Sequence, residues 1–177
     1  MDAKKVSFRK AKKADKKLLK EWFNKEHVRK FWQHKHEMWE QCESYLDGDK
    51  HLLDYWICCY DAKPYGLIIT GDVSEINPND HLVPWIETEG KTLTIDFMIG
   101  EKSFLGKGLA ETTLNKFIYT QDPAVAALLV DPEVKNAQAI HIYEKTGFVR
   151  VSTFTRGEGF FKGVPHYLMK LKILRRE

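Results

Sequence analysis

The sequence predicts an α+β fold in which helices flank one mostly antiparallel sheet. Segments with strand-like alternation or a continuous apolar run recur along the chain, and segments with helical periodicity separate them. Strands that a hairpin joins pair antiparallel, and such pairs are expected in the middle and at the end of the chain. Because 177 residues without a repeat or a linker match one domain, we expect a single domain over residues 1–177.

The first half of the chain is expected to contain three strands and three helical segments. KVSFRKA alternates like a first strand, and DKKLLKEWFN has the periodicity of a helix for which Asp15 is a suitable N-cap. Further helical segments are expected at His27–Trp32 and Lys35–Leu46. LLDYWICCY and YGLIITGDV predict strands that DAKP joins in a hairpin. SEINPNDHLVPWIETEG then predicts a long loop, and such a loop in a compact domain is more often functional than idle.

The second half alternates strands with helices and closes with a hairpin. KTLTIDFMIG predicts a strand, and EKSFLGKGLAETTLNKFIYT predicts a loop that leads into a helix. VAALLV is apolar without alternation, which is typical of a buried central strand. VKNAQAIHIYEKTG predicts a helix that ends at Gly147, a suitable C-cap. FVRVSTFT and VPHYLMKLKIL predict the last two strands, which RGEGFFKG connects.

The composition is that of a soluble globular protein, with 43% hydrophobic and 30% charged residues. No apolar run approaches the length that spans a bilayer, and MDAKKVSFRKAKKADKK contains no hydrophobic signal region. We therefore expect a cytoplasmic protein without a membrane partner. Cys42, Cys58 and Cys59 lack the spacing of metal ligands, so they are expected to be buried reduced thiols, and no metal is expected.

The charges are distributed unevenly along the chain. Residues 1–36 contain 13 Lys and Arg against 4 Asp and Glu, and the rest contains 15 against 21. The basic N-terminal region lacks interleaved aromatic residues and any DNA-binding signature, so a solvated helix face is favoured over a nucleic-acid partner. Residues 72–101 contain seven acidic residues and one basic residue. Two interpretations of this acidic segment remain open, a binding site for a cationic ligand and a solvated loop.

SFLGKGLAETTLNKFI, from Ser103 to Ile118, brings glycines and a lysine to the start of a predicted helix. A nucleotide-binding P-loop is disfavoured, because the spacing from Gly100 to Gly106 is wrong and no hydroxyl follows Lys107 to bind magnesium. Backbone N–H groups at such a helix start still form an anion site when glycines allow close approach. From this segment alone, a metal-free pyrophosphate site and a tight strand-to-helix turn remain equally open.

Taken together, LGKGLA and NAQAIHIYEKTGF resemble the motifs of the GNAT superfamily of acetyl-coenzyme A-dependent N-acetyltransferases, and their order and separation by one strand also match. The resemblance implies a sheet that splays between the fourth and fifth strands, with acetyl-coenzyme A as co-substrate. It implies cofactor contacts from the pyrophosphate loop, the preceding strand and the later helix: Gly106, Lys107, Gly108, Leu109, Ala110, Met98, Ile99, Asn136 and Tyr143. The superfamily often has Gln or Arg where Ser103 stands, so that one side-chain anchor is absent here.

Over about Val6 to Met169 the chain is most similar to the aminoglycoside 6'-N-acetyltransferases, in VSFRKAKKADKKLLKEWFNKEHVRKFW, PWIETEG, TIDFMIGEKSFLGKGLA and VDPEVKNAQAIHIYEKTGFVRV. Aminoglycosides are polycationic small molecules, which fits the acidic segment 72–101. The resemblance implies substrate contacts from Asp96 and Asp131, and more weakly from loop residues: Asp80, Trp85, Glu87, Glu89 and Glu158. Trp85 is also interpretable as a packing residue of the loop.

Two residues are candidates for the proton transfers of acetyl transfer to an amine. Asp96 stands in the middle of a predicted strand, where Asp is disfavoured, and would act as the general base. Tyr143 lies on the helical face of Asn136, two turns along, and would protonate the departing thiolate. The alternatives are an Asp satisfied by hydrogen bonds on a solvated sheet face and an aromatic packing residue.

Three functions are therefore compared. The first is an aminoglycoside 6'-N-acetyltransferase that works by direct attack in a ternary complex. The second keeps the fold and cofactor but acetylates a polyamine, a siderophore precursor or a protein amine. The third is a non-catalytic domain that binds coenzyme A or a basic partner. The sequence is compatible with a monomer and with a homodimer.

Overall fold

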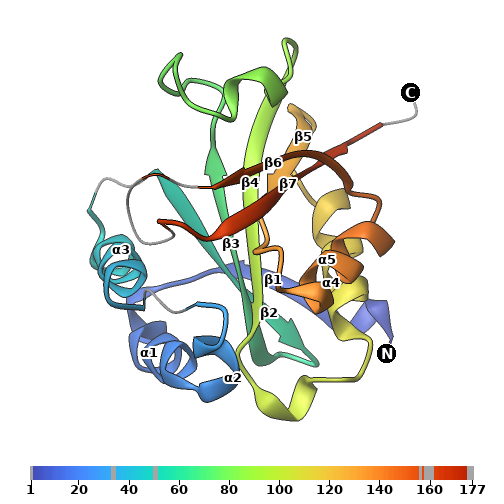
Figure 1. Cartoon of the computed structure of the whole chain (residues 1–177). Coiled ribbons are helices and arrows are strands. Elements are labelled where there is room, and N and C mark those ends of the chain that lie inside the picture. The colour runs from blue at the N-terminus through green and yellow to red at the C-terminus, as the bar shows by residue number, and fades with distance from the viewer. Residues whose placement is uncertain (1, 33–34, 50–51, 156, 158–161, 175–177) are drawn as a thin grey trace. The chain divides into compact units, whose positions relative to one another are not determined.

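A computed structural model describes residues 2–32, 35–49, 52–155, 157 and 162–174. The strands are β1 (Val6–Lys10), β2 (Leu53–Tyr60), β3 (Lys63–Asp72), β4 (Lys91–Ile99), β5 (Val125–Val130), β6 (Val149–Thr155) and β7 (Pro165–Lys172). The α-helices are α1 (Lys16–Asn24), α2 (Glu26–Arg29), α3 (Lys35–Asp47), α4 (Leu109–Tyr119) and α5 (Ala137–Lys145). In the described part of the chain the strands form one seven-stranded sheet in the order β1-β2-β3-β4-β5-β7-β6 (Figure 1).

The pairing within this sheet confirms the predicted α+β class. β1 pairs antiparallel with β2, and β7 pairs antiparallel with both β5 and β6. β4 and β5 run parallel, which makes the sheet mixed. No helix among the described residues combines the length and apolar character that crossing a membrane requires.

The chain falls into two compact units, and strands β3 and β4 and helix α4 are shared between them. We call Met1–Thr70 with Asp96–Lys116 the N-terminal unit, and Gly71–Ile95 with Phe117–Glu177 the C-terminal unit. The organisation of the chain as one domain stays a prediction.

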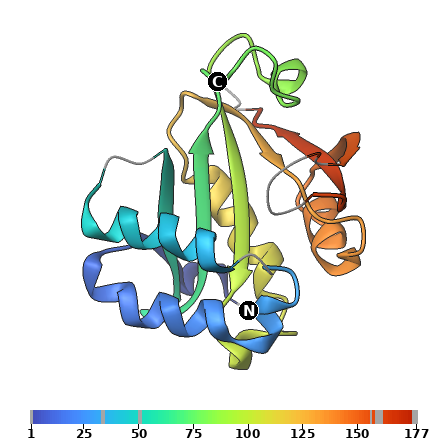
Figure 2. The same cartoon turned by 60° about the vertical axis from the view of Figure 1, so that its left-hand side comes forward.

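The core of the N-terminal unit lies between helices and the strands that they cover. α1 packs beside α3 (Figure 2, blue and cyan), as the apolar spacing of each helix requires. One buried cluster joins side chains of both layers: Leu19, Trp22, Phe23, Val28, Cys42 and Leu46 from the helical segments, and Tyr55, Ile57, Cys59, Leu67, Ile69 and Met98 from the strands. All three cysteines are free and buried, as predicted.

Asp15 occupies the N-cap position of α1, but its side chain does not cap the helix. Its two carboxylate oxygens accept hydrogen bonds from both terminal nitrogens of Arg9, each at 2.7 Å, and one also accepts from the backbone N–H of Lys12 at 2.8 Å. The predicted N-cap position is therefore confirmed, whereas the side chain makes a bidentate pairing with Arg9 in place of the capping hydrogen bond.

We expect Asp15→Asn to lower the free energy of unfolding at neutral pH by about 1–3 kcal/mol, because it breaks a charge-assisted pair at a buried carboxylate. The hydrogen bond from Arg9 is the main cause that lowers the pKa of Asp15. Because the pKa of Asp15 is lower in the folded state, its pairing stabilises the fold fully at a pH above the unfolded-state pKa, which is about 4. This stabilisation is lost as the pH falls through the pKa of the folded state. The free energy of unfolding, measured by urea denaturation between pH 7 and pH 2, should fall less in the variant than in wild type. An equal fall in both proteins would contradict this prediction.

The β2–β3 hairpin turns at Asp61 and Ala62, which have φ angles of 48° and 61°. Two central residues in the left-handed region are the requirement of a type I′ turn, which matches the twist of the flanking strands. DAKP was therefore correctly predicted to contain a hairpin turn, but Lys63 and Pro64 already belong to β3.

The C-terminal unit contains the parallel pair and the final hairpin. The parallel ladder runs from Lys91–Val125 to Thr94–Leu129, so it ends before β4 reaches Ile99. This is the place where the sequence predicts that the sheet splays. β5 is buried along almost its whole length, as its apolar run predicts. α5 ends with Gly147 in a left-handed conformation, φ 93°, just beyond the helix, which confirms the predicted stop.

Candidate active site

The predicted phosphate loop of the N-terminal unit contains two glycines in the left-handed backbone conformation. After β4 the chain makes a short 3-10 turn at Lys102–Phe104 and then reaches Gly106 and Gly108, whose φ angles are +70° and +67°. A side chain at either glycine would meet no atom within 4 Å, so this side of the loop is open. Left-handed residues at the start of an 11-residue helix direct backbone N–H groups into one concave surface. This geometry is compatible with the predicted pyrophosphate site, which stays a prediction.

The other residues of the loop fit the same arrangement. Lys107 is exposed between the two glycines, and its Nζ lies 5.8 Å from the centre of the Phe104 ring. Leu109 is buried and fixes the first turn of α4, whereas Ala110 is half-buried. Ser103 is exposed.

Met98 and Ile99 lie at the end of β4, where the chain approaches β3 closely. A side chain on Gly66 would lie 2.7 Å from the carbonyl oxygen of Met98, so only glycine fits at that point of β3. The carbonyl of Ile99 accepts a hydrogen bond from Nε2 of His27 at 3.0 Å. The proposed backbone contacts of Met98 and Ile99 with pantetheine stay predictions, and the Ile99 carbonyl already has a partner within the protein.

Asp96 is half-buried on the face of β4 that also carries Met98. Tyr55, which is buried on β2, lies near enough for the Asp96 charge to influence it. Burial is the main cause that raises the pKa of Tyr55, followed by the charges of Cys42 and Asp96. Tyr55 is a neighbour of the candidate base that the sequence did not reveal, because its position in an alternating strand predicts only an apolar face.

Asn136 and Tyr143 lie at the two ends of α5 in the C-terminal unit. The side-chain oxygen of Asn136 accepts from the backbone N–H of Ala139 at 3.1 Å, which confirms the predicted helix start. Tyr143 is buried, and its ring meets the ring of Phe148 edge-on at a centroid distance of 5.4 Å. Tyr143 therefore packs in the core, and its role as an acid stays a prediction.

We expect Tyr143→Phe to slow acetyl transfer roughly tenfold, because the departing thiolate would lose its proton donor. The effect should be smaller than that of losing the base, since a thiol with a pKa near about 8.5 leaves tolerably without a proton. The Phe ring keeps the contact with Phe148, so the melting temperature should change little. Single-turnover rates measured with saturating substrates provide the check, and a rate equal to wild type would remove Tyr143 as the acid.

The long loop of the C-terminal unit is tied to β7 through Glu87. Glu87 lies 2.6 Å from Lys170 Nζ and 3.2 Å from Lys172 Nζ, and Lys170 also donates to the backbone carbonyl of Trp85 at 2.6 Å. The hydrogen bond from Lys170 is the main cause that lowers the pKa of Glu87. These contacts bring Trp85 and Glu87 together and make Glu87 an anchor of the loop, with its charge compensated by two lysines.

The remaining acidic candidates have different surroundings. Asp80 accepts a hydrogen bond from the backbone N–H of Leu82 at 2.9 Å and lies 3.2 Å from His81 Nδ1. Asp131 is half-buried directly after β5, and Glu89 is exposed. Glu158 lies outside the described residues. Within the acidic segment, Asp72 and Glu101 also pair with lysines, so recognition of a cationic ligand would depend on the other carboxylates.

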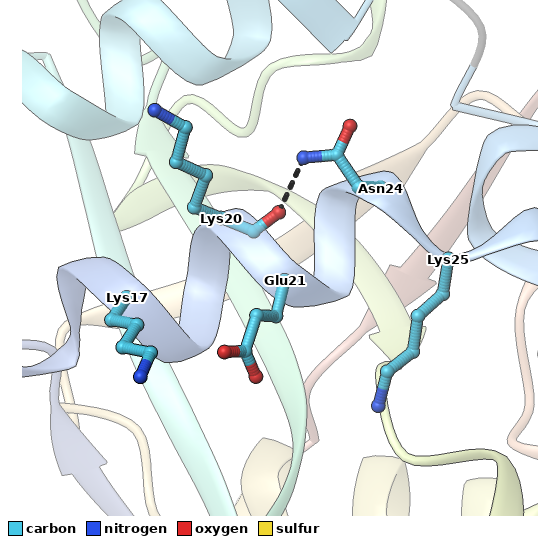
Figure 3. Close-up of a pocket in the computed structure, with 5 residues that line it drawn as sticks. All are labelled: Lys17, Lys20, Glu21, Asn24 and Lys25. Atoms are coloured by element: carbon cyan, nitrogen blue, oxygen red, sulfur yellow. Dashed lines mark hydrogen bonds between the residues drawn. The ribbon is translucent and has the colours of Figure 1, made fainter.

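A shallow surface pocket on α1 lies apart from all of these candidates in the sequence. Figure 3 shows the residues that line it: Lys17, Lys20, Glu21, Asn24 and Lys25. The dashed line in Figure 3 is the hydrogen bond from the Asn24 side chain to the Lys20 carbonyl, at 2.8 Å. Surface lysines around an open depression are what a solvated basic helix face produces. Among the described residues, His, Cys, Asp and Glu form no group suited to hold a metal ion.

Comparison with known proteins gives a family match over most of the chain. The family model described as "Acetyltransferase (GNAT) domain" matches residues 11–156. An aminoglycoside N(6')-acetyltransferase type 1 from Klebsiella pneumoniae is 26% identical over 155 residues, which cover 80% of this chain and 73% of that protein.

Solved structures agree with this match. An aminoglycoside N(6')-acetyltransferase from Legionella pneumophila superposes with a TM-score of 0.78 at 24% identity, covering 95% of this chain and 92% of that one. AAC(6')-Ib in complex with coenzyme A and kanamycin gives 0.74 at 25% identity, covering 94% of each chain. A spermidine N-acetyltransferase from Vibrio cholerae, in complex with coenzyme A and spermine, gives 0.66 at 16% identity, covering 96% of each chain.

Proposed function

Because the chain belongs to the GNAT acetyltransferase family, whose members use acetyl-coenzyme A, we propose that it acetylates the 6'-amine of an aminoglycoside. The proposal that the acceptor is an aminoglycoside rests on one observation, the similarity to an aminoglycoside N(6')-acetyltransferase over 80% of the chain. The donor is supported by the open loop at Gly106 and Gly108, whose backbone geometry fits a pyrophosphate.

Acetyl-coenzyme A supplies a thioester, and the residues of the chain hold it and move protons. Gly106 to Ala110 would bind the pyrophosphate, Met98 and Ile99 the pantetheine, and Asn136 the cofactor near α5. Asp96 would accept the proton that the acceptor ammonium must lose before its nitrogen attacks the thioester carbonyl. As the carbon–sulfur bond breaks, Tyr143 would donate a proton to the thiolate, and the second proton that the nitrogen loses on becoming an amide would replace it. Holding both substrates together supplies much of the acceleration, so no covalent enzyme intermediate is needed.

The polycationic acceptor would be recognised by carboxylates. Asp96 and Asp131 are the first candidates, with Asp80 and Trp85 in the loop as additional contacts. Glu87 would act indirectly, because its ion pairs with Lys170 and Lys172 hold the loop in place. Carboxylates that face the ammonium groups of the acceptor favour cationic substrates over others and increase the association rate.

A polyamine acetyltransferase is the second candidate function. It is favoured by one observation, the structural similarity to the spermidine N-acetyltransferase that binds coenzyme A and spermine. At 16% identity this similarity concerns the fold, and spermine shares with aminoglycosides only its multiple positive charges. The similarity to aminoglycoside enzymes is higher in both identity and TM-score, which is why we place aminoglycosides first.

An acceptor screen tests the proposal. Release of free thiol from acetyl-coenzyme A is measured with kanamycin, tobramycin, spermidine and a lysine peptide at equal concentrations. We expect kcat/KM for the two aminoglycosides to exceed that for spermidine and the peptide. Equal or higher values with spermidine would favour the second function, and no thiol release with any amine would favour a non-catalytic domain that binds coenzyme A.

A further inference from the structure

Three successive residues, the last of β4 and the two that follow it, are each held by a residue of α1, of α2 or of the junction between these helices. The carbonyl of Ile99 accepts from His27 at 3.0 Å, and the carboxylate of Glu101 accepts from Trp22 Nε1 at 2.6 Å and from Lys25 Nζ at 2.9 Å. Gly100, between them, lies directly under the indole of Trp22. We call Trp22, Lys25 and His27 the clamp; they belong to the N-terminal unit together with the residues that they hold.

The indole of Trp22 packs so closely on Gly100 that no side chain fits at position 100. A side-chain carbon placed on Gly100 would lie 2.2 Å from the Cδ2 atom of the indole, so only glycine fits beneath the ring. Trp22 itself is 0% exposed, and its buried N–H is satisfied by Glu101. The ring position and the backbone path of Gly100 therefore determine each other.

The clamp acts at the point where β4 leaves β3. The backbone N–H groups of Gly100 and Glu101 both donate to the carbonyl of Tyr65, at 2.8 and 3.0 Å, which is the pattern of a β-bulge. A bulge bends the strand and redirects the chain that follows it. The clamp thus holds the residues that set the direction in which the phosphate loop departs.

The segment between Glu101 and the glycines is short and internally bonded. Phe104 N–H donates to the carbonyl of Glu101 at 2.9 Å, and the next N–H in the chain, that of Leu105, donates to Lys102 at 3.1 Å. The Phe104 ring packs on Tyr65 at a centroid distance of 5.2 Å. A displacement at Glu101 would therefore be transmitted through this turn to Gly106 and Gly108, because the turn has its own hydrogen bonds and moves as a unit.

The charges of the clamp are complementary to Glu101. The hydrogen bond from Lys25 is the main cause that lowers the pKa of Glu101, and the bond from Trp22 adds to it. The ion pair is about one-third exposed, with side-chain exposures of 31% and 33%. An ion pair of this kind contributes little to stability by itself, but together with the indole N–H it fixes one rotamer of Glu101.

We propose that Trp22 and Lys25 are positioning residues for acetyl-coenzyme A. By holding Glu101, they set the geometry of the phosphate loop and thereby the affinity for the donor, without touching it. Trp22 and Lys25 lie 79 and 76 residues before Glu101 in the sequence. The N-terminal helical segment therefore supports a loop that is distant from it along the chain. The inference rests on the donor part of the proposed function.

The test measures the dissociation constant of acetyl-coenzyme A by titration calorimetry, the kcat with saturating donor, and the melting temperature. Lys25→Met removes the ion pair at a partly exposed position, and Trp22→Phe removes the N–H while a ring stays over Gly100. We expect each to raise the dissociation constant about 2- to 30-fold, as is typical of coupling through packed groups. The kcat with saturating donor should stay within about twofold of wild type, because the clamp holds no group that Asp96 requires.

Two further variants separate positioning from a general loss of stability. Lys25→Arg keeps the charge and the donors, so it should restore the wild-type affinity. Glu21→Gln changes an exposed carboxylate of the same helix and should leave affinity unchanged. Melting temperatures that fall while the affinity of Lys25→Met and Trp22→Phe equals that of wild type would overturn the proposal. Wild-type protein that fails to bind acetyl-coenzyme A would overturn both this inference and the donor part of the proposed function.

Discussion

Asp96→Asn is expected to reduce kcat by about 10²- to 10⁴-fold, because an amide cannot accept the proton of the acceptor ammonium. The substitution preserves the shape of a half-buried side chain on β4, so the fold should persist. Since the proposed role concerns the acceptor, the dissociation constant of acetyl-coenzyme A should stay close to that of wild type. Steady-state rates of thiol release, together with calorimetric titration of the donor, measure both quantities.

Asp54→Asn is the matched control for this prediction. It makes the same chemical change on β2 in the N-terminal unit, at a half-buried residue whose carboxylate pairs with Lys10 at 2.6 Å. Asp54→Asn should leave kcat unchanged. A normal kcat for Asp96→Asn with a lower melting temperature would show that Asp96 is structural, and a different base would have to be sought.

Gly108→Val is expected to weaken acetyl-coenzyme A binding at least tenfold. Valine at a φ of +67° is strained by about 1–3 kcal/mol, and a shift of the loop that relieves this strain would turn the backbone N–H groups away from the pyrophosphate. A loss of about 1.4 kcal/mol corresponds to about tenfold in affinity. Calorimetric titration with acetyl-coenzyme A and with acetyl-pantetheine, which lacks the pyrophosphate, would locate the loss in the pyrophosphate contacts.

Gly48→Val provides a control with the same kind of backbone strain. Gly48 has a φ of +91°, and a side-chain carbon there would meet no atom within 4 Å, as at Gly108. Unlike Gly108, it follows α3 and has no predicted role in binding. Both variants should lose a similar amount of stability, while only Gly108→Val should lose affinity. Equal affinities in both variants would mean that Gly108 shapes the turn without holding the donor.

The bounds of strands and helices were predicted well where they depend on residues that are adjacent in the sequence. The apolar run VAALLV became β5 with the predicted bounds, and the glycine after EKT ended α5. Asp15 shows where local reasoning fails. Its position predicts a cap, but Arg9 on β1 takes its oxygens through a pairing that only the folded chain creates.

In the candidate site, too, the sequence could predict local features but not long-range contacts. The unusual backbone angles at Gly106 and Gly108 could be predicted from the sequence because a turn at a helix start is made by consecutive residues. The contacts that hold such elements in place were not predictable. Trp22 with Glu101, and Lys170 with Glu87, are partners that lie far apart in the chain, and neither pairing leaves a periodic signal in the sequence. Tyr55 near Asp96 was missed for the same reason.

The most direct test of the proposed function is the structure of the product formed from kanamycin and acetyl-coenzyme A. The reaction mixture is examined by mass spectrometry for the number of acetyl groups and by two-dimensional NMR for their position. We predict one added acetyl group, on the 6'-amine, formed together with one equivalent of free coenzyme A. Acetylation at another amine, or an unmodified aminoglycoside under conditions in which spermidine is acetylated, would contradict the proposed function.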